Sequence, residues 1–561
     1  IMNLSECQTR GCGLIEIFRE SFIDNGDLPA ITNYGSDKTL TYHDVARRIA
    51  RLHLFFEAAG VRPGDKIALL GKNTANWICV FMASLTYGTV IVPILHDFNP
   101  ADAAHIINHS DARLLFVNDS IWEHLDFDGL PELIAVISLD SRKIIAERSK
   151  KLASYVKNLS RAFARRYPGG FKTSDIHYAS RNDDDTCIIN YTSGTTGYSK
   201  GVMLTYDNIA GNVTFGVASR LHYAGSRALS FLPLAHAYGC AFDMLVPLAT
   251  GSHITVLGRT PTPNILLKAF AEVRPNLIIC VPLILEKIYR KMIVPMITRK
   301  PIRWILALPG LDRTIYSRIR SRLVEAFGGE FEEVIIGGAP LNPEVEEFLY
   351  RIKFPFTVGY GMTECGPLIS YAPWRQYEPG SSGSVLPGIM EARILADEHT
   401  PGQGEIMVRG QNVMKGYYKN PDATLAALDE DGWLHTGDMG RIGGRDGSTI
   451  FIRGRYKTMI LRSNGQNIYP EEIEAKLNNM PYVSESLVVE RDGRLVALVY
   501  PDREDMDANR LSDHQLGPIM EEVRNELNAL VAPYEQIARI QVVPEEFKKT
   551  PKRSIKRFLY M

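Results

Sequence analysis

A run of glycine, hydroxyl and lysine residues between positions 191 and 201 could form a phosphate-binding loop. Glycines let the backbone turn with its N–H groups exposed, hydroxyls add donors, and a lysine supplies positive charge, so together they can hold a polyanion. The run lacks the G-x-x-x-x-G-K-[ST] spelling of a P-loop, and a plain surface turn is the alternative. Its place between an expected strand and an expected helix favours phosphate binding. The candidate contacts are Thr192, Ser193, Gly194, Thr195, Thr196, Gly197 and Lys200.

A pair of glycines and a tyrosine offer a slot for a flat purine ring. Gly337 and Gly338 follow an expected strand and permit close approach of a ligand to the backbone. Tyr360 supplies a ring for stacking. A tight strand-to-helix turn is the alternative explanation for the two glycines. The candidate nucleotide contacts here are Gly338, Ala339, Pro340, Gly359, Tyr360 and Gly361.

Thr363 and Glu364 place a hydroxyl beside a carboxylate. Hard oxygen ligands of this kind suit a Mg²⁺ ion that keeps several waters and bridges phosphates. The same pair could instead be a helix N-cap followed by a first-turn acid. The two roles are compatible, and we expect both, with Glu364 as the metal ligand.

These segments resemble motifs of the adenylate-forming superfamily, which contains acyl-CoA synthetases, nonribosomal-peptide adenylation domains and luciferases. The resemblance starts with the segment from Tyr191 to Gly201 and continues in the family's order over most of the chain. The later segments are Ile336-Gly337-Gly338-Ala339-Pro340, Gly359-Tyr360-Gly361-Met362-Thr363-Glu364, Gly432-Trp433-Leu434-His435-Thr436-Gly437-Asp438, Arg455-Tyr456-Lys457 and Gly465-Gln466-Asn467-Ile468-Tyr469-Pro470.

The resemblance implies roles for further residues. Asp438 would accept hydrogen bonds from both ribose hydroxyls, and Arg455 would contact ribose and phosphate; an exposed ion pair is the alternative for these two. Lys457 matches the hinge between a large and a small domain. Gly465 would line the channel for the coenzyme A thiol, where a side chain would obstruct. His236 matches a position beside the acyl site, although a lone histidine is more often a packed core residue.

The end of the chain departs from the family pattern. The family carries a catalytic lysine in a Lys-Thr-x-x-Gly-Lys-Ile-x-Arg-like string, and Ser554 occupies that position in the segment from Lys549 to Arg557. In an extended segment Lys552, Ser554 and Lys556 would share one face, because side chains alternate with period two. We therefore expect Lys552 or Lys556 to replace the missing cation; loss of activity is the alternative.

The reaction that the resemblance implies is ATP-dependent activation of a carboxylic acid, with Mg²⁺, followed by transfer to coenzyme A. The stretch from Asp431 to Arg455 looks like the signature of fatty acyl-CoA synthetases, which implies a medium to long fatty acid. Apolar residues after His236 could line an acyl tunnel or simply form a core helix. An adenylation domain or acyl-AMP ligase serving a carrier protein stays open, as does a weakly catalytic nucleotide-binding regulator, which Ser554 would permit. The apolar residues in question are Phe242, Leu245 and Val246.

The elements that must position these residues alternate between helices and short apolar strands, which predicts an α/β fold. We expect a large N-terminal domain of parallel sheets flanked by helices (1–455), with a small β-barrel-like subdomain at about 383–452. A small mobile α+β domain (456–561) should follow the hinge. One alternating block covers 41–117: helices at 41–60, 75–87 and 101–109, strands at 66–70, 90–93 and 113–117. A second contains strands at 186–191, 277–281, 333–336 and 357–359.

Composition excludes several other classes. The formal net charge of -1 gives no overall attraction to nucleic acid. Seven scattered cysteines without a C-x-x-C pair speak against disulfides and zinc and favour a reducing, cytoplasmic location. The first twenty residues do not look like a secretory signal, and the longest apolar run, Leu277 to Leu285, is too short to span a membrane. The expected partners are small-molecule substrates, and an oligomer stays open.

A basic stretch at 142–172 holds ten Lys or Arg residues and one acid, Glu147. Its apolar residues recur at helical spacing. We expect a helix packed on its own domain with a solvated basic face. Peripheral attachment to anionic lipid is the alternative.

Overall fold

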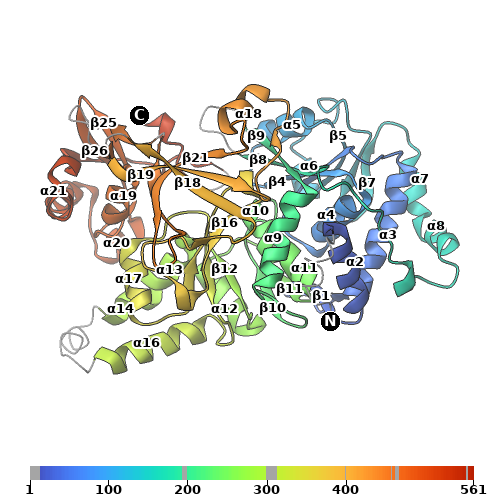
Figure 1. The fold of residues 1–561 in the computed structure, drawn as a ribbon, viewed down its shortest axis with the longest axis horizontal. Helices are drawn as coiled ribbons and strands as arrows, with labels where there is room; N and C mark the ends of the chain where they lie inside the picture. The colour runs from blue at the N-terminus through green and yellow to red at the C-terminus, as the bar shows by residue number, and fades with distance from the viewer. Residues whose placement is uncertain are drawn as a thin grey trace.

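The structure is a computed structural model that describes residues 13–192, 199–297, 312–397, 400–456, 458–461, 467–550 and 554–561. Figure 1 shows a molecule with its N-terminal helices at one end and its C-terminal elements at the other. These C-terminal elements include α19 (Pro470–Leu477), β25 (Val483–Arg491), β26 (Arg494–Pro501) and α21 (Asp513–Leu530). Between the two ends lie mixed sheets covered by helices. The expected α/β class is confirmed.

The first sheet has eight strands in the order β20-β9-β8-β4-β3-β5-β6-β7. Its middle is parallel, and its two edges are antiparallel. The strands are β3 (Lys66–Leu70), β4 (Val90–Ile94), β5 (Ala112–Val117), β6 (Ala135–Ser138), β7 (Ile144–Glu147), β8 (Thr186–Thr192), β9 (Lys200–Thr205) and β20 (Gly416–Tyr417). Helices around it are α2 (Leu14–Asp24), α3 (Tyr42–Ala58), α4 (Ala75–Tyr87), α5 (Pro100–His109), α6 (Asp119–Trp122), α9 (Tyr206–Ala218) and α18 (Pro421–Ala427).

Local sequence explains where the helices of this block begin. Thr41 caps α3: its hydroxyl accepts the Asp44 N–H at 3.1 Å, and the Asp44 carboxylate accepts the Thr41 N–H at 3.2 Å. Thr205 and Asn208 form the same reciprocal cap on α9. The helix expected at 75–87 and the strand expected at 66–70 are found with these bounds.

One part of the expected arrangement is wrong. β8 pairs with β4 and so belongs to the first sheet, not to the second alternating block. The helix expected after the phosphate-loop segment is confirmed as α9, which begins at Tyr206. β9, which is antiparallel to β8, lies between that segment and the helix. An apolar strand reveals that it is buried but not which strand it pairs with.

The second block forms two parallel sets of strands. β10 (Arg227–Ser230), β11 (His253–Val256) and β1 (Pro29–Asn33) are parallel, and β2 (Thr39–Thr41) adds an antiparallel edge. β12 (Ile278–Cys280), β13 (Val334–Ile336) and β14 (Phe356–Val358) are parallel, and an Ala228–Leu277 bridge joins the sets. The helices here are α10 (Ala237–Gly239), α11 (Val246–Thr250), α12 (Pro263–Val273), α13 (Pro282–Met292), α14 (Val294–Ile297), α16 (Asp312–Ala326) and α17 (Pro343–Arg351), with a π-helix at Cys240–Leu245.

A seven-stranded antiparallel sheet follows, in the order β15-β16-β17-β22-β21-β19-β18. It starts at Tyr360, before the expected 383. Two of its strands, β15 and β21, carry the candidate residues Tyr360 and Asp438. The strands are β15 (Tyr360–Gly361), β16 (Leu368–Tyr371), β17 (Ser384–Val385), β18 (Met390–Asp397), β19 (Thr400–Gly410), β21 (Leu434–Gly443) and β22 (Thr449–Arg455).

The C-terminal residues have hydrophobic clusters of their own, one of which runs from Ile468 to Ile537. Their elements are β23 (Ile460–Leu461), β24 (Asn467–Ile468), α19 (Pro470–Leu477), β25 (Val483–Arg491), β26 (Arg494–Pro501), α20 (Arg503–Ala508), α21 (Asp513–Leu530) and β27 (Arg539–Val542).

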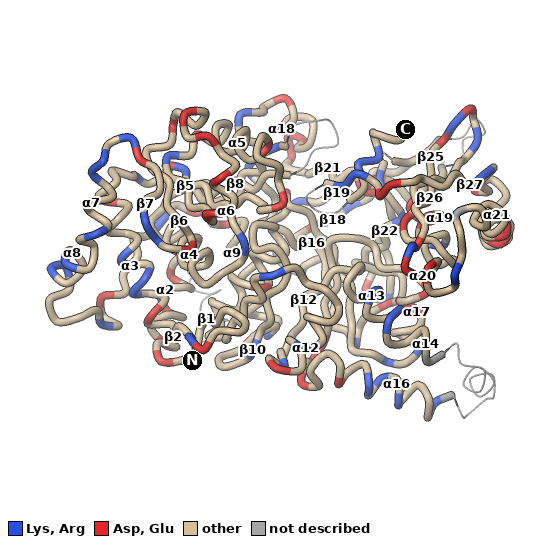
Figure 2. Tube along the Cα trace, turned by 180° about the vertical axis from the view of Figure 1, so that it is seen from behind, with Lys and Arg blue, Asp and Glu red and all other residues tan. Residues whose placement is uncertain are grey.

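The basic stretch forms two short helices, α7 (Leu152–Lys157) and α8 (Leu159–Arg166), where one helix was expected. Leu152 and Phe163 are buried, and the Arg51 guanidinium of α3 lies 5.3 Å from the Phe163 ring centroid, so the stretch packs on its own domain as expected. All ten basic side chains are exposed. Figure 2 shows Lys and Arg positions in blue on α8 and on the segments around α7. Among the described residues, no helix is both long and apolar enough to cross a membrane.

Candidate active site

Strand pairing brings Lys200 and Glu364 to one tyrosine. β20 pairs with β9, which starts at Lys200, and places Tyr417 at this edge. The Tyr417 hydroxyl donates a 2.9 Å hydrogen bond to Glu364 Oε1, and Lys200 Nζ lies 4.8 Å from the centroid of the Tyr417 ring. Burial raises the pKa of Tyr417, so its hydroxyl stays a donor. The structure thus brings together two candidate residues that lie far apart in the sequence.

The ends of the phosphate-loop hairpin are fixed by β8 and β9. Thr192 pairs with Lys200, and its hydroxyl donates to the Lys200 carbonyl at 3.5 Å. A side chain at Gly201 would press on Ile189 and on the Tyr191 ring. The candidates Ser193, Gly194, Thr195, Thr196 and Gly197 lie outside the described residues.

Tyr360, Asp438 and Arg455 form a second connected group. The Tyr360 hydroxyl donates to Asp438 Oδ2 at 2.6 Å, and Arg455 Nε lies 3.3 Å from Asp438 Oδ1, across the β21–β22 pair. The Arg455 side chain is 70% exposed, whereas that of Asp438 is 10% exposed. Burial raises the pKa of Asp438, and the Arg455 charge opposes that shift. The sequence predicted a ring for stacking at Tyr360 but not the hydroxyl that holds the carboxylate.

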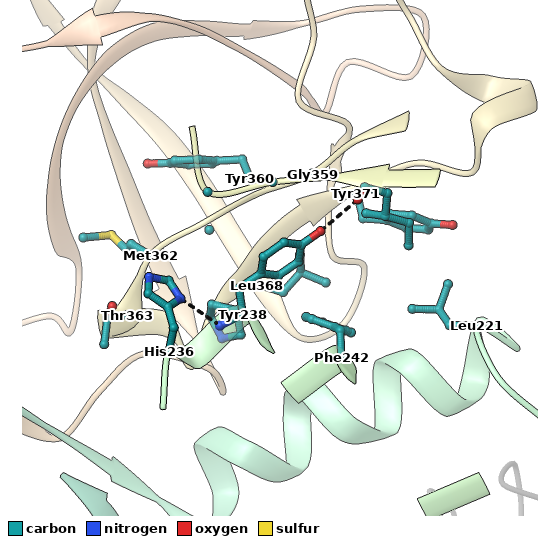
Figure 3. Close-up of a pocket in the computed structure, with 15 residues that line it drawn as sticks. Leu221, His236, Tyr238, Phe242, Gly359, Tyr360, Met362, Thr363, Leu368 and Tyr371 are labelled. Atoms are coloured by element: carbon teal, nitrogen blue, oxygen red, sulfur yellow. Dashed lines mark hydrogen bonds between the residues drawn. The ribbon is translucent and has the colours of Figure 1, made fainter. Parts of the chain in front are cut away.

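A pocket extends from Tyr360 and Thr363 into an apolar chamber that is bordered by Leu221, Phe242 and Tyr371 (Figure 3). The candidates that line it are His236, Gly338, Gly359, Tyr360, Gly361 and Thr363. Ala339 and Pro340 lie exposed in the turn that follows Gly338. The other residues that line the pocket are Leu221, Tyr238, Phe242, Ile335, Gly337, Met362, Pro367, Leu368 and Tyr371.

Glycines keep the turn beside the pocket close to neighbouring groups. Gly338 has a φ of 85°, which favours glycine, and a Cβ at Gly337 would lie 3.0 Å from Cζ of Tyr238. His236 is no plain core residue: it lines the pocket, and its Nδ1 accepts the Tyr238 N–H at 3.3 Å. Phe242 also lines the pocket, whereas Leu245 and Val246 are fully buried in the core. The apolar stretch after His236 therefore contains both a pocket-lining residue and core residues.

The threonine beside Glu364 is not a helix cap. Thr363 and Glu364 lie inside a 3-10 turn, Thr363–Cys365, whose N-cap residue is Met362. The expectation that Thr363 is a helix N-cap is therefore wrong. Thr363 is buried and lines the pocket, and Glu364 is half-buried. Within the described residues no cluster of three His, Cys, Asp or Glu could hold a metal alone, so a Mg²⁺ ion at Glu364 would need phosphate and water ligands, which suits its chemistry.

The described residues on either side of the tail lysine region pair with each other. The Thr550 N–H donates to the Ser554 carbonyl at 2.8 Å, and the Lys556 N–H donates to the Lys548 carbonyl at 2.8 Å. Lys549 and Ile555 form an antiparallel bridge. The shared face expected for Lys552, Ser554 and Lys556 stays a prediction. Lys552, Lys457 and Gly465 lie outside the described residues.

Tyr417 is the residue that sequence reasoning missed. It was hidden because its role depends on β20 pairing with β9, more than two hundred residues earlier in the chain. The only local signal was a pair of adjacent tyrosines after a glycine, Tyr417 and Tyr418, which any strand could carry.

Comparison with known proteins identifies the family. The family described as "AMP-binding enzyme" matches residues 18–418 of the chain. The chain belongs to this family. It is 28% identical over 522 residues to the long-chain-fatty-acid–CoA ligase ACSBG2 of Rattus norvegicus, covering 86% of this chain and 76% of the relative. It is 26% identical over 566 residues to the long-chain-fatty-acid–CoA ligase FadD15 of Mycobacterium bovis, covering 92% and 90%.

Solved structures of the family share the fold. ATP-bound MatB from Rhodopseudomonas palustris superposes with a TM-score of 0.73 at 23% identity, over 97% of this chain and 98% of that one. The structural similarity extends through the C-terminal elements, beyond residue 418, where the family match ends. At 23% identity the comparison shows that this chain shares the fold of MatB, and no more than that.

Proposed function

We propose that this AMP-binding enzyme is a fatty acid–CoA ligase that uses ATP in two steps. One observation carries the proposal: a single pocket has candidate nucleotide contacts, Tyr360 and Thr363, at one side and an apolar chamber at the other. A carboxylate at the junction would lie beside the phosphates while its alkyl chain is buried. Relatives named long-chain-fatty-acid–CoA ligases support the choice of acid.

In the first step a carboxylate oxygen attacks the α-phosphorus of ATP, and pyrophosphate leaves. Lys200 and the loop at 193–197 neutralise charge on the phosphates, as phosphoryl transfer requires. Asp438 accepts hydrogen bonds from the ribose hydroxyls, Tyr360 and Arg455 hold that carboxylate, and the turn at Gly338, Ala339 and Pro340 borders the adenine. A Mg²⁺ ion at Glu364 would add charge stabilisation at the phosphates.

In the second step the coenzyme A thiol attacks the acyl carbonyl, and AMP leaves with the electron pair of the broken anhydride bond. His236, at the pocket wall, borders the reacting carbonyl. No protein nucleophile is needed. The five described cysteines are free and buried, and burial raises the pKa of the Cys280 thiol to about 12, which keeps it protonated. Free thiols also favour a reducing, cytoplasmic location.

We place the boundary between a large and a small domain at 455–456, with Lys457 as hinge. The separate hydrophobic cores support this division. Contacts across it are polar: Asn342 Nδ2 donates to Asn479 Oδ1 at 2.7 Å, and Arg290 Nη2 donates to the Asn478 carbonyl at 2.6 Å. Interfaces of this kind permit domain motion. Lys457→Pro should spare adenylation and slow thioester formation; equal loss of both steps would argue against rotation.

We also propose that α7 and α8 attach the enzyme to anionic membranes by charge. Their apolar side chains pack inward, so binding should depend on salt and not on insertion. Vesicles of phosphatidylcholine with increasing phosphatidylglycerol should bind the protein increasingly. Changing Lys157, Arg161 and Arg165 to Glu should abolish binding. Substitution by Glu at three exposed basic residues elsewhere should leave most of the vesicle binding intact. These control residues are Lys287, Arg318 and Arg322. Binding independent of phosphatidylglycerol would refute this proposal.

The test of the main proposal is AMP release over a panel of fatty acids, with and without coenzyme A. Release that requires both a fatty acid and coenzyme A supports the ligase. Acyl-AMP formation without transfer to coenzyme A would favour an acyl-AMP ligase that serves a carrier protein. ATP binding without AMP release for any acid would favour the regulatory alternative that Ser554 permits.

A further inference from the structure

The apolar chamber has a closed end. In Figure 3, His236, Met362 and Thr363 lie at one side of the pocket, and Leu221 and Tyr371 lie at the opposite side. Leu221, Phe242 and Tyr371 are each at most 8% exposed, so the rest of the protein packs behind them. An alkyl chain that enters from the Thr363 side must therefore stop at these side chains.

Tyr371 is the most firmly held of the three. Its hydroxyl donates to Glu333 Oε1, and Glu333 Oε2 also accepts the Trp374 N–H at 2.9 Å. The Tyr371 ring packs edge-on against Phe215, with the ring centroids 5.8 Å apart. Its backbone is fixed as well, because Tyr371 pairs with Ser384 in the sheet, and Gly383 packs so closely on it that a Cβ there would lie 2.5 Å from the Tyr371 carbonyl carbon.

Leu221 and Phe242 have no such anchor, because their side chains are held by packing alone. A shift of these side chains disturbs van der Waals packing but leaves no polar group without a partner. Moving the Tyr371 ring would instead remove a hydrogen bond from the buried Glu333 and leave part of a carboxyl group without a partner. The Tyr371 ring is therefore the side chain that an acyl chain longer than the chamber displaces least readily.

We infer that Tyr371, anchored by Glu333, limits the length of the acyl chain that this enzyme activates. The inference rests on the proposed function and names a specificity-determining residue for it. An acid that ends short of the ring loses contacts, at about 0.8 kcal/mol per methylene that is not buried, or roughly fourfold in affinity. An acid that is longer than the chamber must displace the ring and is discriminated more strongly.

The test measures kcat/KM for AMP release with saturated straight-chain acids from butanoic to eicosanoic acid. Tyr371→Ala should move the cut-off to longer chains and raise kcat/KM for acids just beyond it by roughly tenfold or more, because several methylenes gain space. Tyr371→Phe keeps the ring and should keep the cut-off. Tyr350→Ala, at a tyrosine 47% exposed on α17, is the matched control and should leave the profile unchanged.

Two results separate the failure of this inference from the failure of the proposed function. If the unchanged enzyme activates no acid in the series, the proposed function fails, and the inference fails with it. If it activates acids but Tyr371→Ala leaves the cut-off in place, the inference alone is overturned. Should Tyr371→Ala not fold, Tyr371→Leu combined with Glu333→Gln removes the ring together with its buried acid, and it must shift the cut-off in the same direction.

Discussion

The hydroxyl of Tyr417 donates a hydrogen bond to Glu364 while its ring lies beneath the ammonium group of Lys200. One side chain thus positions the candidate metal ligand and the candidate phosphate cation. Nothing in the local sequence links the three residues, since they come from β9, a 3-10 turn and β20. The sheet edge brings them together.

Tyr417→Phe should therefore weaken the use of Mg-ATP. A hydrogen bond to a charged group contributes about 1.5 to 3 kcal/mol, and Glu364 is half-buried, so we expect roughly a tenfold rise in the Mg²⁺ concentration needed for half-maximal pyrophosphate release. The affinity for Mn²⁺, read from its paramagnetic signal in the presence of a non-hydrolysable ATP analogue, should fall in parallel.

The control for this change is the neighbouring tyrosine. Tyr418 directly follows β20, and its hydroxyl donates to Asp111 Oδ2 at 2.7 Å. Tyr418→Phe removes an equivalent hydroxyl from the other face and should leave the Mg²⁺ dependence as it is. Equal effects of the two changes would mean that Tyr417 supports the strand and not the site.

Removing the charged groups themselves should cost more. Lys200→Ala or Glu364→Ala should keep the fold but slow fatty-acid-dependent pyrophosphate release by about 10²- to 10³-fold, by analogy with the loss of one oxyanion donor. The melting temperature and circular dichroism check the fold. Release at the normal rate from a folded Lys200→Ala enzyme would contradict the role given to this lysine.

Helix boundaries were predictable because their signals are local. Thr41 with Asp44 fixes the start of α3, and Gly88, with a φ of 92°, follows the end of α4. Pairing partners were not predictable in the same way. The apolar run of β8 shows burial, yet its neighbour β4 is about a hundred residues away, and β9 was read as the end of a loop.

The same difference applies to the candidate site. Motif resemblance could select Gly338, Tyr360 and Asp438 as candidates, because each motif is a short local sequence. The bond between Tyr360 and Asp438 was missed, since it depends on how two strands of the antiparallel sheet lie in space.

Nucleotide affinity should fall as the pH is lowered. In the proposed role, Asp438 accepts hydrogen bonds from both ribose hydroxyls as a carboxylate. Burial raises its pKa, so protonation occurs at a higher pH than for an ordinary aspartate. Arg455 opposes this shift. Arg455→Ala should therefore move the loss of AMP affinity to higher pH, as calorimetry across a pH series would show. Arg351→Ala, which removes an exposed arginine on α17, should leave the profile in place; an unmoved profile in Arg455→Ala would contradict the assignment.

The role of the tail lysines can be tested by removing them and by restoring a lysine at position 554. If a lysine of the tail replaces the family's catalytic residue, changing both Lys552 and Lys556 to Ala should slow acyl-adenylate formation by about 10²- to 10³-fold. Lys548→Ala removes the same charge from the segment that pairs with Lys556 and should change little. Ser554→Lys puts an ammonium group back at the family position, so it should restore adenylation in the doubly changed enzyme. Rapid-quench measurement of acyl-AMP follows each variant, and normal formation without both lysines would show that neither is needed.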